Sequence, residues 1–137
     1  MDVKEYLQEI RKHDMMIQNK LVEVQQLRCL AISTSSPIGG DMVQGSRQGD
    51  RIGNIIAKII DMENEIDDLI DEFIEVKNER ISIMEKLPAL QYQVLHKHYV
   101  QYKSLVMIAE EGSYSYQYIV ETHGKALKTY ENLLKPI

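Results

Sequence analysis

Residues 104–119 read SLVMIAEEGSYSYQYI, and this stretch decides the fold of the C-terminal third of the chain. Ser104 and Ser115 suit helix N-caps, because a serine hydroxyl accepts a hydrogen bond from the backbone N–H groups that a first helical turn leaves unpaired. Gly112 is typical of a helix end. The stretch therefore predicts a short helix that ends at Gly112, a tight turn, and a second helix that begins after Ser115.

Apolar residues on both sides of this stretch extend the helical pattern. Downstream, residues at spacings of three or four predict that the last helix continues to about Leu134: Ile119, Thr122, Ala126, Leu127, Tyr130 and Leu133. Upstream, Pro88 suits the first turn of another helix, whose inner face would be Leu90, Val94, Leu95 and Tyr99. Two helices joined by a tight turn, with Ala109 at the expected crossing, describe a helix-turn-helix.

The middle of the chain carries a heptad repeat. Asp50 is expected to cap a helix that runs to about Lys86, and Arg80 interrupts its seam. The residues of the seam are Ile52, Ile55, Ile59, Met62, Ile66, Leu69, Phe73 and Val76. A 3.5-residue repeat of this length predicts a coiled coil or helical hairpin.

An antiparallel partner for this helix precedes it in the chain. Residues from about Asp2 to Ala31 read as one helix with a narrow apolar stripe. Residues 33–50 are rich in Gly, Ser and Pro, which predicts a loop, and Arg47 and Arg51 within or beside it are candidate contacts to phosphate or a partner. The first stripe is too narrow to cover the whole seam, so we expect the seam to form an oligomer or partner interface as well.

These patterns predict an all-α protein with two parts, a helical hairpin at residues 1–86 and a helix-turn-helix at residues 87–137. The formal net charge of the chain is −5, which by itself disfavours DNA as a partner. The acidity lies in residues 49–87, which hold five basic and eleven acidic residues. Residues 88–137 hold five basic and four acidic residues, a weakly positive balance.

The C-terminal third resembles region 4 of bacterial sigma factors. The positions that carry the resemblance are Leu87-Pro88, Val94-Leu95, Tyr99, Ser104-Leu105, Ile108-Ala109-Glu110, Ser115, Ile119 and Lys125-Ala126-Leu127. The domain arrangement of the whole chain is similar to that of small sigma-like transcription regulators of phages and prophages. This group includes the ArpU-type late-gene regulators. The resemblance implies a DNA-binding regulator of transcription in the cytoplasm of a bacterial host, with RNA polymerase as a further candidate partner.

The resemblance also implies a DNA-binding site on the last helix. Tyr116, Gln117, Val120 and Glu121 would face base edges in the major groove. The residues expected at or near phosphate are Lys103, Ser104, Ser115, Tyr118, His123, Lys125 and Lys128. Sigma factors carry several Arg or Lys where this chain has Tyr116, Tyr118 and Val120, which predicts lower affinity. A homo-oligomer, most simply a dimer, would compensate by doubling the contacts.

Other chemistry finds little support in the sequence. The single cysteine excludes an internal disulfide, and His96 and His98 point to different faces of a helix, a poor metal pair. Phosphate-binding glycine loops, nucleophile elbows and catalytic dyads are missing from the pattern. We therefore expect no enzyme activity, no metal and no cofactor. We also expect no membrane segment and no signal peptide, because Asp2, Lys4 and Glu5 stand where an apolar run would be.

Two other classes of function stay open. Small terminase subunits of the DNA-packaging machinery also join a helix-turn-helix to a helical oligomerisation region, and a ring of many subunits would distinguish them from a dimeric regulator. Alternatively, the chain is a helical interaction protein whose coiled coil binds a host factor. Unchanged DNA binding after Gln117 and Glu121 are replaced by alanine would favour that reading.

Overall fold

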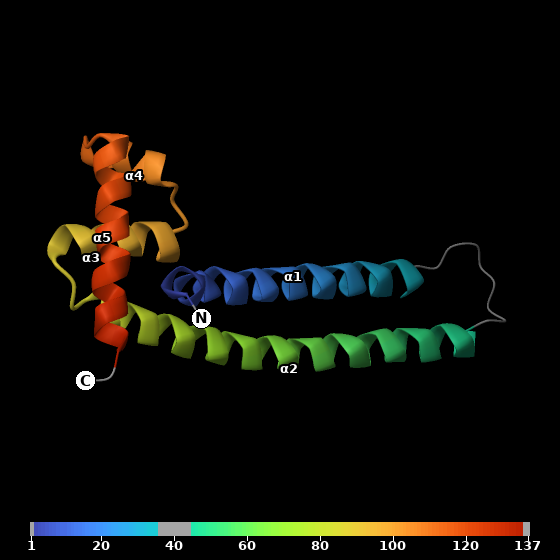
Figure 1. The fold of residues 1–137 in the computed structure, drawn as a ribbon. Coiled ribbons are helices and arrows are strands. Elements are labelled where there is room, and N and C mark those ends of the chain that lie inside the picture. Colours follow the sequence, from blue (N-terminus) through green and yellow to red (C-terminus); the bar gives the residue numbers. More distant parts are fainter. Residues whose placement is uncertain (1, 36–44, 136–137) are drawn as a thin grey trace. The chain divides into compact units, whose positions relative to one another are not determined.

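The computed structural model describes residues 2–35 and 45–135, and every regular element in these ranges is helical, as expected. The elements are α1 (Val3–Ser35), α2 (Gly45–Met84), α3 (Ala89–Leu95), the π-helical turn η2 (His96–Val100), α4 (Leu105–Gly112) and α5 (Tyr116–Leu134) (Figure 1). Packing divides the chain into two compact units. The first unit is Met1–Asp14 with Glu72–Ile137, and the second unit is Met15–Asp71.

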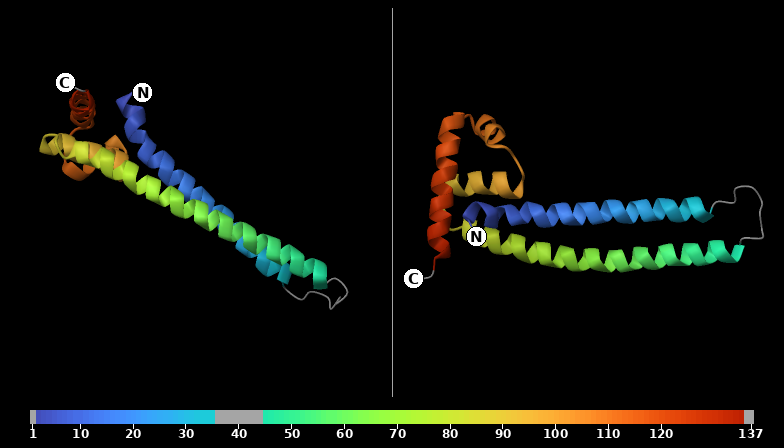
Figure 2. Two further views of the ribbon diagram at one scale, coloured as in Figure 1. Left: turned by 90° about the horizontal axis from the view of Figure 1, so that it is seen from below. Right: turned by 45° about the vertical axis from the view of Figure 1, so that its right-hand side comes forward.

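In the second unit, the parts of α1 and α2 that it contains lie side by side and run antiparallel (Figure 1, Figure 2). Lys20 pairs with Glu65 at 3.3 Å, and Arg28 pairs with Glu63 at 3.2 Å. The later residue of α1 thus pairs with the earlier residue of α2, as antiparallel helices require. The apolar residues buried in this unit are Ile17, Val24, Ile55, Ile59 and Ile66. Because exposed ion pairs contribute little, this buried row is the main stabilising feature of the unit.

The helices α1 and α2 extend farther into residues 33–50 than the sequence predicts. Residues 33–35 belong to α1 and residues 45–50 belong to α2, so Asp50 lies inside a helix and is not its N-cap. Residues 36–44 of the expected loop lie outside the described residues. Gly49 and Gly53 each cost a helix about 1 kcal/mol relative to alanine, but Ile52 and Ile55 of the same helix are half-buried and buried. Packing of the amphipathic face therefore outweighs the local preference for a loop.

The first unit has a core drawn from both ends of the chain. Its buried residues come from α1, from the end of α2 and the turn after it, from α3 and η2, and from α5: Val3, Leu7, Ile10, Met84, Leu87, Leu95, Tyr99, Ala126 and Tyr130. Tyr130 is fully buried, and its hydroxyl donates to the backbone oxygen of Arg80 at 3.0 Å. This core thus joins residues on both sides of position 86 in one compact unit.

Arg80 is a buried centre of polar contacts in the first unit. The sequence predicted only that it interrupts the α2 seam, yet it is 7% exposed. Its guanidinium donates to the Glu9 carboxylate at 2.6 Å and lies 3.7 Å from the centre of the Tyr6 ring. A charge can be buried at modest cost when it is paired and hydrogen-bonded in this way. Through these contacts, Arg80 links the end of α2 to the start of α1.

A second, smaller core holds α3, α4 and α5 together. Its buried residues are Val94, Ile108, Ala109 and Ile119. Both predicted caps are confirmed, since the Ser104 hydroxyl accepts from the Met107 N–H and the Ser115 hydroxyl accepts from the Tyr118 N–H, each at 3.1 Å. The caps fix where α4 and α5 begin.

The turn between α4 and α5 differs from the expectation in one detail. Gly112 is the last residue of α4, and the left-handed conformation falls on Ser113, with φ 58°. A Cβ at position 112 would lie 2.7 Å from Cδ2 of Tyr114. Glycine is therefore needed here for the close approach of the Tyr114 ring, whereas the positive φ is carried by the next residue.

Candidate nucleic-acid interface

The first half of α5 is divided into a buried side and an exposed side. Ile119 is fully buried against α3 and α4. Five of the predicted DNA contacts are exposed on the other side of this half: Tyr116, Gln117, Tyr118, Val120 and Glu121. Ser115 stands just before them with its hydroxyl engaged in capping. The predicted base-facing residues thus share one accessible helix face, anchored from behind.

His123 does not belong to this face, and its prediction as a phosphate contact is wrong. The side chain is 8% exposed, and its Nε2 lies 2.8 Å from the Tyr99 hydroxyl. The ring also contacts His98, with ring centroids 5.2 Å apart. Burial, the nearby His98 and Lys4 lower the pKa of His123 to about 4, so the ring is neutral at pH 7. On a helix with 3.6 residues per turn, position 123 falls on the same side as Ile119.

The predicted cations divide into two groups. Lys125 and Lys128 are exposed on α5, and no ion pair involves them in the described part of the chain. Lys103 precedes the cap of α4, and its ammonium lies 2.9 Å from the Glu111 carboxylate. Lys97 of η2 reaches the same carboxylate at 3.3 Å. The hydrogen bond from Lys103 is the largest cause that lowers the pKa of Glu111, which therefore stays ionised.

The structure shows exposed apolar residues on α4 and in the α4–α5 turn that the sequence-based prediction did not include. Val106 and Met107 on α4 and Tyr114 in the turn are about half exposed. The rings of Tyr114 and Tyr118 lie 5.5 Å apart. Helical spacing was a usable signal for the two α4 residues, because they sit one and two places after the inward-facing Leu105. The surface at the start of α5 thus includes the aromatic pair of Tyr114 and Tyr118.

The α2 seam, which the sequence predicts to form an oligomer or partner interface, is partly buried within the chain. Ile55, Ile59 and Ile66 are buried within the chain. The other predicted interface residues are half-buried: Ile52, Met62, Leu69, Phe73 and Val76. The exposed isoleucines of α2 are instead those that flank the seam, namely Ile56, Ile60, Ile70 and Ile74. Phe73 packs against the core of the first unit.

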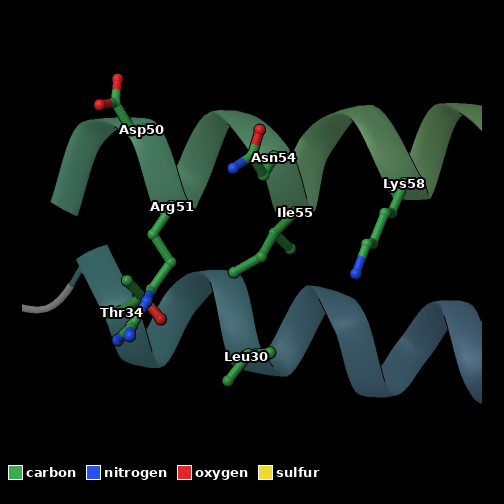
Figure 3. Close-up of a pocket in the computed structure, with 7 residues that line it drawn as sticks. All are labelled: Leu30, Thr34, Asp50, Arg51, Asn54, Ile55 and Lys58. Carbon is green, nitrogen blue, oxygen red and sulfur yellow. The ribbon is translucent and has the colours of Figure 1, made fainter. Parts of the chain in front are cut away.

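A cavity of about 460 Å³ opens between the helices of the second unit. Figure 3 shows Arg51 reaching from α2 toward Thr34 of α1, and Lys58 extending its ammonium toward α1. Leu30 and Ile55 supply apolar lining. Arg51, expected at the edge of the loop, is therefore a helix residue beside a cavity. The side chain of Arg47, the other arginine of that hypothesis, lies outside the described residues.

Across residues 2–35 and 45–135, no three His, Cys, Asp or Glu side chains gather closely enough to hold a metal ion. In the same ranges, none of the helices combines the length and apolar character that crossing a membrane requires.

Comparison with known proteins gives no relative on which an assignment can rest. No family model, no curated protein and no solved structure matches this chain.

Proposed function

We propose that this chain binds double-stranded DNA through the first half of α5 and regulates transcription. The observation that carries the proposal is the exposed row of Tyr116, Gln117, Val120 and Glu121 on a capped helix with Ile119 buried behind it. An α-helix fits the major groove when its outer side chains are free to meet base edges.

The packing of α4 and α5 supports a helix-turn-helix as the frame of this site. Ala109 on α4 is 3% exposed and shares a core with Ile119 on α5. Ser113 turns the chain between the two helices. A small residue at the crossing lets the helices approach closely, which is the geometry that presents the second helix of such motifs. The resemblance to sigma factor region 4 points to the same helix.

The chemistry of the exposed row suits base recognition. The Gln117 amide can both donate to and accept from adenine, and the Glu121 carboxylate can accept from the amino group of cytosine. Val120 can contact a thymine methyl. Lys125 and Lys128 lie farther along the same helix and supply charge for phosphate. We infer a binding protein without catalytic activity, working in a bacterial cytoplasm, with RNA polymerase as a second partner.

Fluorescence anisotropy with the full chain tests this proposal. The probes are the promoter DNA upstream of its own coding sequence and a scrambled duplex, each at two salt concentrations. We expect tighter and salt-sensitive binding to the promoter, lost in Q117A/E121A. The control is E131A/N132A, which removes an acid and an amide that are exposed near the end of the same helix. Equal binding of all three proteins, or no binding by the unchanged protein, contradicts the proposal.

We also propose that two copies associate through the exposed flank of α2. The isoleucines of this flank, Ile56 and Ile60, are about half exposed and one turn apart, and a second copy would bring two DNA-binding helices to one operator. Sedimentation of I56E/I60E against the unchanged chain tests this. A dimer that becomes a monomer supports it, a monomer throughout contradicts it, and a large ring favours the DNA-packaging alternative.

A further inference from the structure

Glu111 holds two of the lysines that the DNA-binding part of the chain contains. It lies near the end of α4 and pairs with Lys97 at 3.3 Å and with Lys103 at 2.9 Å. The side chains of the two lysines are 24% and 29% exposed, and that of Glu111 is 35% exposed. Both lysines therefore share one carboxylate at the surface. This ion-pair cluster is accessible to water and to an external ligand.

This cluster removes a large share of the positive charge available near α5. Residues 88–137 contain five lysines and no arginine, and Glu111 occupies two of the five. DNA affinity depends strongly on the number of phosphates that cations neutralise. A carboxylate already placed between two ammonium groups competes with phosphate for both of them.

We propose that Glu111 is an internal counterion that lowers the affinity of this protein for DNA by competing with backbone phosphate for Lys97 and Lys103. The inference rests on the proposed function, because it assigns the regulation of affinity at the same site. Exposed ion pairs are weak, so the two lysines can exchange Glu111 for a phosphodiester oxygen. The counterion therefore weakens sequence-independent contacts while leaving base contacts on α5 unchanged.

The variant E111Q tests this inference, because glutamine keeps the length and polarity of the side chain and removes its charge. Its matched control is E110Q, which changes the net charge equally at an exposed neighbour. No ion pair involves Glu110 in the described part of the chain. Anisotropy titrations of the full chain use a promoter duplex and a scrambled duplex. The salt concentration is varied about fourfold, from about 50 to about 200 mM.

We expect E111Q to bind both duplexes more tightly and with a steeper salt dependence. Two freed cations add up to about 1.8 to the slope of log affinity against log salt, or about tenfold more loss of affinity across that range. We expect E110Q to keep the slope of the unchanged protein. The triple variant K97Q/K103Q/E111Q should lose the added slope, which shows that the two lysines carry it.

The outcomes separate this inference from the proposed function. If the unchanged protein binds DNA and E111Q has the slope of E110Q, the counterion role is overturned while DNA binding stands. If the triple variant keeps the steeper slope of E111Q, the lysines are not the groups released and the inference also fails. If none of the proteins binds either duplex, the inference and the proposed function fail together.

Discussion

Acidification from pH 7.5 to 5 should destabilise the fold through His123. The imidazole is buried beside His98, and the Tyr99 hydroxyl 2.8 Å from its Nε2 can donate a hydrogen bond to the neutral ring. Burial, His98 and Lys4 lower the pKa of His123 from 6.5 to about 4, and burial raises the pKa of Tyr99 to about 12. The unfolded chain therefore binds this proton at a higher pH than the folded protein does.

The sign and size of the effect follow from that difference. Because the folded pKa is depressed, stability is fully present above pH 6.5 and is lost progressively as the pH falls toward 4. At about 1.4 kcal/mol per pH unit, the free energy of unfolding should fall by about 2 kcal/mol between pH 7.5 and 5. Burial also lowers the pKa of His96, so the total change in the unmodified chain should be larger.

Urea unfolding, followed by circular dichroism at both pH values, measures this change. H123Q cannot titrate there, and we expect its pH-dependent loss to be smaller than that of the unchanged chain by about 2 kcal/mol. H13Q is the matched control, because His13 stands on α1 outside the ring cluster. If H123Q and H13Q lose the same free energy as the unchanged chain, the buried imidazole is not the titrating group and the reasoning is refuted.

Four further substitutions test helix propensity and packing by the free energy of unfolding in urea. G53A and G124A should each raise stability by about 0.5–1 kcal/mol, because an added Cβ meets nothing within 4 Å at either site; a loss of stability would contradict this. R80M should lower stability by about 3 kcal/mol, because it leaves the Glu9 carboxylate without the guanidinium now 2.6 Å away. Adding E9Q to R80M should recover part of that loss, and no recovery would refute the pairing. Y130F should cost about 1 kcal/mol through the lost 3.0 Å hydrogen bond to Arg80, and an unchanged stability would argue against it.

Features of the chain that depend on near neighbours were predictable. Ser104 and Ser115 cap their helices as their sequence context indicated, because a cap bonds to a backbone group only two or three residues away. Helical spacing likewise identified buried positions such as Ile108 and Ile119. The same reasoning placed the exposed row of α5 at the candidate site, since the face opposite a buried stripe is accessible.

Features that depend on distant partners were mispredicted. His123 was assigned to phosphate because the sequence did not show that Tyr99 would lie 2.8 Å from its ring. In the sequence, Arg80 only interrupts the heptad. Its role follows from Glu9, the partner that lies 71 residues earlier in the chain.

The sequence by itself determined that this protein is helical, where α4 and α5 begin, and that Gln117, Val120 and Glu121 of α5 face outward. These properties follow from hydrogen bonds and periodicity within a few residues of chain. Only the tertiary structure decided that His123 is buried, that Arg80 is a centre of contacts and that Glu111 holds Lys97 and Lys103. Each of these depends on which groups the fold brings together from separate segments, and burial and charge pairing are properties of that assembled environment.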